Sequence, residues 1–246
     1  MHVDYNWEDD RPLLWSAQVD RPTLEPMFDR IIDKYLTHEH YYRIADKPVF
    51  SIFDYPTLIK GLDGVAETVE AFDWMRSRCA DRGLGGLDIQ AIARAGTLST
   101  QPGAQDRALQ NEKVARQLGF DSGSMYQFCM TSGGSGDYVP WADKAIRHWP
   151  LYEDIYGTFY PHVSIGWDNT PRTPSAGREQ VVEHATPDAF EACCWRAKAY
   201  LDERPDQAPL VTINSWNEWT EGSYLLPDMR WGYRYLQAVR NVFAPN

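Results

Sequence analysis

The feature that most constrains the fold is a regular alternation of helical and strand-like segments along the chain. Apolar residues recur at helical spacing in one set of segments and form short β-favouring runs in the other. The expected helices cover residues 24–36, 65–82, 105–118, 138–156, 187–203 and 229–243, and the expected strands cover residues 48–53, 87–93, a short stretch from 120, 162–167 and 210–215. Strands separated by helices predict a parallel α/β fold.

Composition narrows the partners of such a fold. The 246 residues are enough to bury a sizeable core and predict a single domain over residues 1–246. A net charge of −11 without any basic run argues against nucleic acid as a partner and is compatible with a neutral carbohydrate. Ten tryptophans and fourteen tyrosines offer stacking surfaces, although most aromatic residues in a barrel serve packing.

The hydropathy pattern bears on location. No run of about 18 apolar residues is present, so neither a membrane span nor a membrane partner is expected. Residues 1–10 contain no basic segment followed by an apolar one, which predicts that the chain as written has no signal peptide and is cytoplasmic; a missing N-terminal part would change this expectation.

The segment Val211–Gly222 carries the clearest chemistry. A β-favouring run leads into Glu218 and Glu221, which are interleaved with Trp216 and Trp219. A glycosidic oxygen needs a proton to leave, and the sugar carbon needs negative charge or a nucleophile, so two nearby carboxylates are the minimum apparatus for glycoside hydrolysis. Repulsion between the two carboxylates and the less polar surroundings created by the indoles make the pKa values of the two groups differ.

A plainer interpretation of the same carboxylates stays open. One glutamate would pair with an arginine such as Arg230, and the other would be a solvated loop residue.

Candidates for substrate contact are polar and aromatic residues within this segment or after other expected strands. They are Asn6, Trp7, Asp54, Tyr126, Trp167, Asp168, Asn169, Arg172, Trp216, Asn217 and Trp219. Asp168 and Asn169 would bind sugar hydroxyls and Arg172 would orient a carboxylate; the alternative is a turn with a structural salt bridge. Asp54 has the alternative role of a helix N-cap ahead of a proline. The glycine-rich segment 131–136 is interpreted either as a lid or as an ordinary flexible connection.

No metal and no organic cofactor is expected. The cysteines at 79, 129, 193 and 194 lack metal-ligand spacing and are interpreted as reduced or buried thiols. The His38–His40 segment follows a helix and has no partner cluster. No phosphate loop or dinucleotide fingerprint is present.

Three blocks of the sequence resemble the WbsX-like proteins, a group similar to glycoside hydrolase family 99, the endo-α-mannosidases. The blocks are residues 41–50, residues 166–172, and residues 216–236 with the Trp-Asn-Glu-Trp-Thr-Glu-Gly motif. This resemblance implies a (β/α)8 TIM-type barrel whose active site lies at the carboxyl ends of the strands. It also implies a retaining mechanism through a 1,2-anhydro sugar. Glu218 would then be the base that removes the 2-hydroxyl proton, and Glu221 would be the general acid and then the base.

The expected strands are too few for a closed barrel, which needs eight. Residues 3–7 are similar to the end of an early barrel strand in the same group, whose members carry roughly a hundred residues before it within the usual barrel length. We therefore expect a barrel that is incomplete at the N-terminus, with about five to six strands. Its exposed edge has to pair, be covered or aggregate, and a homodimer would bury it.

Three functions follow from these observations. The first is a glycosidase acting on a polysaccharide or oligosaccharide, with an α-mannosidic linkage implied by the resemblance. The second is a glycosyltransferase role in surface polysaccharide assembly, which has less support because no diphosphate-binding loop or Asp-x-Asp motif is present. The third is a truncated barrel that binds glycan without cleaving it, since catalysis fails with small misplacements.

Overall fold

All five strands expected from the sequence are present in the computed structural model, which describes residues 18–93, 112–172 and 180–244. They are β2 (Lys47–Ile52), β3 (Asp88–Ala93), β4 (Ser122–Met125), β6 (His162–Ser164) and β8 (Thr212–Asn214). Strand β2 pairs in parallel with β3, and β6 pairs in parallel with β8. Helices separate the strands along the chain, so the parallel α/β class is confirmed.

The described residues form two compact units, which are treated separately. The first comprises residues 18–92, 112–123 and 155–157, and the second comprises residue 93 and residues 124–154, 158–172 and 180–244. Residues 1–17 and 94–111 lie outside the described part, and with them the candidates Asn6 and Trp7 and the start of the helix expected from residue 105.

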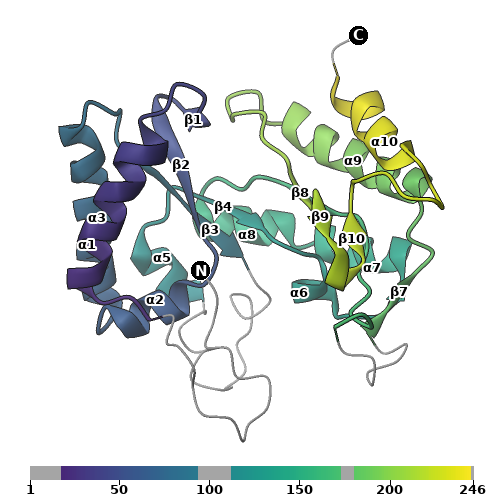
Figure 1. The fold of residues 1–246 in the computed structure, drawn as a ribbon, viewed down its shortest axis with the longest axis horizontal. Helices are drawn as coiled ribbons and strands as arrows, with labels where there is room; N and C mark the ends of the chain where they lie inside the picture. The colour runs from purple at the N-terminus through teal and green to yellow at the C-terminus, as the bar shows by residue number, and fades with distance from the viewer. Residues whose placement is uncertain (1–17, 94–111, 173–179, 245–246) are drawn as a thin grey trace, which may run out of the picture. The chain divides into compact units, whose positions relative to one another are not determined.

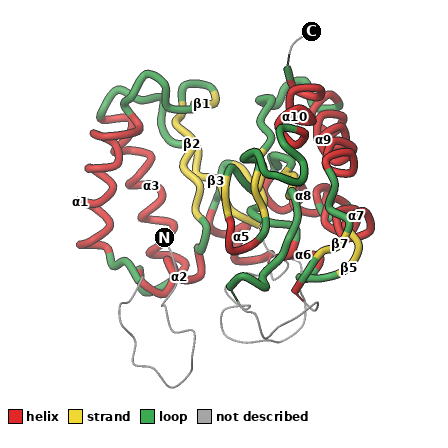
Figure 2. Tube along the Cα trace, turned by 45° about the vertical axis from the view of Figure 1, so that its right-hand side comes forward, coloured by secondary structure: helices red, strands yellow, loops and turns green. Residues whose placement is uncertain are grey.

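The first unit holds most of a sheet with strand order β1-β2-β3-β4; Ala93 of β3 and the last two residues of β4 are grouped with the second unit. The remaining elements of the first unit are β1 (Arg43–Ile44), α1 (Arg21–Ile31), which continues as a π-helical turn (Ile32–Leu36), α2 (Tyr55–Gly61), α3 (Val65–Asp81) and α5 (Glu112–Leu118). Every residue of β3 is buried, as in a parallel sheet covered on both faces. Helices α1 and α3 pack side by side (Figures 1 and 2). The side chains of Phe28 and Phe72 are fully buried.

Asp54 has the role that the alternative interpretation gave it. Its side chain accepts hydrogen bonds from the backbone N and the Oγ1 of Thr57, at 3.3 and 3.1 Å, and so caps the N-terminus of α2. Pro56 occupies the first turn, where its missing N–H is tolerated. A further role of Asp54 in substrate contact stays a prediction.

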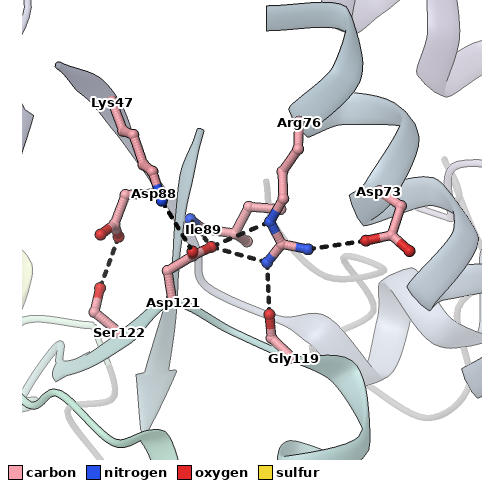
Figure 3. A network of polar contacts seen from close by, with 8 residues as sticks. All are labelled: Lys47, Asp73, Arg76, Asp88, Ile89, Gly119, Asp121 and Ser122. Carbon is pink, nitrogen blue, oxygen red and sulfur yellow. Dashed lines mark hydrogen bonds and ion pairs between the residues drawn. The ribbon is translucent and has the colours of Figure 1, made fainter. Parts of the chain in front are cut away.

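A polar network joins α3 to the sheet of the first unit (Figure 3). Asp121 Oδ2 accepts hydrogen bonds from Arg76 Nη2 at 2.8 Å and from the backbone N of Ile89 at 3.0 Å. Arg76 Nη1 also reaches the exposed Asp73. Nearby, Ser122 Oγ donates to Asp88 Oδ1 at 2.8 Å, and burial raises the pKa of Asp88.

We expect the Asp121→Ala variant to lower the free energy of unfolding by about 2 kcal/mol, because it leaves a part-buried guanidinium and a backbone N–H without their shared acceptor. Asp73→Ala is the matched control and should cost less than about 0.5 kcal/mol, because the Asp73 side chain is 70% exposed. Urea unfolding of both variants measures the difference. Equal losses of unfolding free energy in the two variants would show that Asp121 stabilises the fold no more than the exposed Asp73 does.

The second unit holds the other elements. They are α6 (Cys129–Ser132), β5 (Gly136–Asp137), α7 (Tyr138–Ile146), α8 (Trp149–Tyr156), β7 (Val182–Glu183), α9 (Pro187–Asp202), β9 (Asn217–Glu218), a 3-10 turn (Trp219–Glu221), β10 (Ser223–Tyr224) and α10 (Arg234–Phe243); the last two residues of α8 are grouped with the first unit. Helices α9 and α10 pack together (Figure 1). The core includes Phe128, Phe159 and Phe190.

Two helices differ from their expected bounds. The single helix expected over residues 138–156 is two helices, because Pro150 cannot donate a backbone hydrogen bond and is accommodated in the first turn of a new helix. The helix expected from residue 229 begins at Arg234. Asp228 and Gly232 close a turn before it, and Gly232 has a φ of +55°, which favours glycine.

The cysteine interpretation agrees with the structure, since all four cysteines are free thiols and three of them, Cys79, Cys193 and Cys194, are buried. Among the described helices, none combines the length and the apolar character needed to cross a membrane.

Candidate active site

The two candidate carboxylates lie on a short hairpin that follows β8. Strand β9 carries Glu218 and pairs antiparallel with β10, and the 3-10 turn between them carries Glu221. Gly222 ends the turn with a φ of +58°, and a Cβ there would approach Asp168 Cβ to 2.7 Å. Glycine is therefore required here both by the backbone conformation and by the close approach of the neighbouring loop.

Arg172 joins the two carboxylates. Its Nη1 donates to Glu221 Oε1 at 2.8 Å, and its Nη2 lies 3.5 Å from Glu218 Oε1. Thr220 completes the connection, because its Oγ1 accepts from Arg172 Nη2 at 2.8 Å and donates to Glu218 Oε1 at 2.6 Å. The arginine partner is thus Arg172 and not Arg230, and it contacts both glutamates.

The loop that carries Arg172 is itself tied to the hairpin. The backbone N of Asp168 donates to the backbone O of Glu221 at 2.7 Å. Asp168 Oδ1 accepts from the backbone N of Thr170 at 2.9 Å, as in the turn that the alternative interpretation described. Asn169 donates its backbone N–H to Gln180 O. Both features of the alternative are therefore present, and substrate contact by Asp168 and Asn169 stays a prediction.

The two carboxyl groups differ in environment. The Glu221 side chain is 9% exposed, whereas that of Glu218 is 32% exposed. Burial raises the pKa of Glu221, Arg172 acts in the opposite direction, and the nearby Glu218 raises it again. Glu221 Oε2 is buried and has no hydrogen-bond partner among the described residues. This carboxyl group is therefore suited to hold a proton and donate it.

Tyr126 directly follows β4 and lies within electrostatic range of the same carboxylates. Burial raises the pKa of its hydroxyl, and the negative charges of Glu221 and Glu218 raise it further, while Asn214 lowers it. Asn214 is held in turn by Gln127, whose Nε2 donates to Asn214 Oδ1 at 2.9 Å. The raised pKa favours the neutral phenol at Tyr126.

The tryptophans of the motif are solvent-accessible. Trp216 is 57% exposed and Trp219 is 51% exposed, and the Trp219 ring lies 4.5 Å from that of Tyr224. Exposed indole faces of this kind stack on sugar rings. Asn217 is also exposed and lies in β9, whereas Trp167 is half-buried beside β7, where its backbone O accepts from Val182 N.

The glycine-rich segment 131–136 is anchored by hydrogen bonds. Ser132 Oγ donates to Trp141 O at 2.8 Å, Trp141 Nε1 donates to Gly133 O at 2.7 Å, and Gly136 pairs with Val182 in the parallel β5–β7 ladder. Both interpretations of this segment, a lid and a flexible connection, stay predictions.

Sequence reasoning missed three parts of this site. Thr220 lies between the two glutamates in the sequence, but its contacts with Arg172 and Glu218 depend on the geometry of the turn. Asn214 ends a strand and could have been included on that ground. The buried His162, which contacts Ser164 on its own strand and Thr212 on the neighbouring β8, has no sequence signal beyond its place in an apolar run.

We expect the Arg172→Gln variant to raise the pKa of Glu221 further, because the two contributions of Arg172 that lower it are removed. Carbon-13 NMR titration of glutamate carboxyl groups, with the Glu221 signal assigned through Glu221→Gln, measures the change. Arg234→Gln is the control, since Arg234 pairs with Asp188 in the same unit. An unchanged or lower Glu221 pKa in Arg172→Gln would contradict the contact.

Solved structures share this fold. One described as a glycoside hydrolase-like protein has a TM-score of 0.62 at 17% identity, over 92% of this chain and 62% of its own. Two structures of the GH99 endo-α-mannosidase from Bacteroides thetaiotaomicron, one with BIS-TRIS-propane, have TM-scores of 0.57 and 0.55 at 17% and 18% identity; each covers 90% of this chain, and 64% and 60% of the other. The described strands and helices therefore have a family-99-like arrangement.

Curated relatives are also longer than this chain. The uncharacterized protein WxcX from two strains of Xanthomonas campestris pv. campestris, ATCC 33913 and B100, is 29% identical over 231 residues in each case. The alignment covers 87% of this chain and 29% of that protein, so this chain spans less than a third of it. A family model described as glycosyltransferase WbsX matches residues 4–239, and the chain therefore belongs to the WbsX family.

Proposed function

We propose that this chain carries the catalytic site of a retaining glycoside hydrolase. The observation that carries the proposal is the pairing of a buried carboxyl group, Glu221, with a more exposed one, Glu218, through the single cation Arg172. The raised pKa of Glu221 favours the protonated form that a general acid needs. The exposed indoles of Trp216 and Trp219, interleaved with the two glutamates, supply surfaces for sugar rings.

In this mechanism Glu221 donates its proton to the glycosidic oxygen as the bond from that oxygen to the anomeric carbon breaks. Glu218 removes the proton of the sugar 2-hydroxyl, whose oxygen attacks the anomeric carbon and forms a 1,2-anhydro sugar. Water then opens this ring: Glu221 takes a proton from the water, and Glu218 returns its proton to the 2-oxygen. Both glutamates recover their starting protonation, and two inversions give net retention.

The proposed substrate class is supported by the fold shared with solved structures and by the net charge of the chain. We propose an α-mannosidic or related neutral polysaccharide or oligosaccharide, because the similar solved structures include an endo-α-mannosidase. The net charge of −11 is compatible with such a substrate and unfavourable for a polyanionic one.

Transfer from a nucleotide sugar is the second candidate, and the description of the matching family favours it. Such a donor carries a diphosphate, which proteins bind with a metal ion or a basic loop. Among the described residues, no three His, Cys, Asp or Glu side chains are grouped to hold a metal ion. Hydrolysis needs none of these groups, which is why we place it first.

A product screen tests the proposal. The purified chain is incubated with α-mannans and a panel of bacterial polysaccharides, and released reducing ends are quantified. We expect cleavage of at least one polymer, without any nucleotide. Calorimetry with GDP-mannose and UDP-glucose accompanies the screen. Nucleotide-sugar binding without polymer cleavage would favour transfer, and polymer binding without cleavage would favour a non-catalytic glycan-binding unit; either result would overturn the hydrolase proposal.

A further inference from the structure

A cavity lies beside the carboxylate pair in the same unit. Its volume is about 510 Å³, within the range of about 300–1,000 Å³ typical of small-molecule sites. Neither Glu218 nor Glu221 lines it. Asp168 and Gly222 do line it, and the Asp168 backbone N donates to Glu221 O. The cavity and the candidate active site therefore share one wall.

Aromatic side chains make up much of the lining, and both tyrosine hydroxyls among them are hydrogen-bonded, whereas the Trp167 indole N–H has no partner among the described residues. Trp167, Tyr224, Trp231 and Tyr235 all line the cavity. The Tyr224 hydroxyl donates to Asp228 Oδ2 at 3.1 Å, the Trp231 backbone N donates to Asp228 Oδ1, and the Tyr235 hydroxyl donates to the backbone O of Ala185. A site whose walls are fixed in advance loses less entropy when a ligand binds.

The charged side chains that line the cavity indicate which class of ligand it favours. Three carboxylates line it, those of Asp168, Glu183 and Asp228, against one arginine, Arg230, and one histidine, His184. The guanidinium of Arg230 lies 4.9 Å from the Trp231 ring centre. Because acidic groups outnumber basic ones, an anionic sugar such as a uronate is disfavoured. Aromatic walls combined with planar polar side chains suit the C–H faces and hydroxyls of a neutral pyranose.

We propose that this cavity is a separate subsite for one neutral pyranose unit, so that a glycan at the carboxylate pair is also held beyond the Asp168–Gly222 wall. The inference takes its ligand class from the proposed carbohydrate function, but it concerns binding and not cleavage. It assigns Trp231 and its neighbours a role in affinity and substrate length that is independent of the acid–base pair.

Binding of single sugars tests the subsite. The full chain carrying Glu221→Gln, labelled with nitrogen-15 at its tryptophan indoles, is titrated with the methyl α-glycosides of mannose, glucose and galactose and with the corresponding uronates. We expect at least one neutral glycoside to shift the indole signals of Trp167 and Trp231 and to bind more tightly than its uronate. Trp231→Ala should weaken this binding by about tenfold.

Two further variants separate a lost contact from a lost fold. Trp231→Phe keeps an aromatic wall and should retain affinity within about twofold, and Trp195→Ala removes an exposed tryptophan of α9 that does not line the cavity, with no effect expected. No binding of any neutral glycoside, tighter uronate binding, or equal weakening by Trp195→Ala and Trp231→Ala would overturn the subsite. These outcomes leave the product screen unaffected, so the two proposals fail separately.

Discussion

Replacing Glu221 with glutamine is expected to lower kcat/KM on an unactivated glycan by about 10²–10⁴-fold, the range that general acid catalysis supplies. Glutamine preserves the shape of the buried side chain but cannot donate the proton that the leaving oxygen needs. Glu203→Gln is the matched control, because Glu203 is an exposed carboxylate of the same unit, with a side chain that is 77% exposed. Its activity should remain at the wild-type level.

The choice of leaving group makes this test specific for the acid. In a glycosyl fluoride the leaving group is the fluoride ion, which departs without being protonated. The Glu221→Gln variant should therefore lose much less activity on a glycosyl fluoride than on the natural glycan. Glu218→Gln should lose activity on both substrates alike, because the 2-hydroxyl must be deprotonated in either case. If Glu221→Gln were equally impaired on both, protonation of the leaving group would not be the step that limits this variant.

The second large effect concerns stability at low pH. His162 is 1% exposed, with Nδ1 lying 2.8 Å from Thr212 Oγ1 and Nε2 lying 3.0 Å from Ser164 Oγ. Burial lowers the pKa of His162 to about 3 in the folded chain, against about 6.5 when unfolded. Between these values only the unfolded chain binds the proton, so stability falls as the pH drops below about 6.5.

This difference predicts that His162 alone removes about 2.5 kcal/mol of stability between pH 7.5 and pH 4.5. Urea unfolding at several pH values measures the loss, and the His162→Gln variant should show a pH dependence that is shallower by this amount. Proton NMR of the His162 ring in the native protein gives a second readout and should show no titration down to pH 4.5. Titration near pH 6 would contradict the assignment even if the variant does not fold.

Local sequence determined the secondary structure of this protein well. The runs around residues 50, 90, 121, 164 and 212 became strands because short apolar segments bounded by turns have few alternatives. Asp54 ahead of Pro56 was recognisable as a cap for the same reason, since a cap depends on residues within one turn. The break between α7 and α8 was missed although Pro150 is a local signal for it. The start of α10 at Arg234 was missed because it depends on the turn that Asp228 and Gly232 close.

In the candidate site, the local sequence predicted some features, and tertiary contacts decided the others. The spacing of Glu218 and Glu221 placed two carboxylates within one turn, and this determined the kind of chemistry to expect. Which of them is buried, and that Arg172, 49 residues before Glu221, joins the two, depended on how the loop after β6 folds against the hairpin. The same holds for the buried neutral state of His162 and for the cavity next to Gly222. These features arise from contacts between segments far apart in sequence, and the pKa of a group follows from the desolvation and charges that such contacts create.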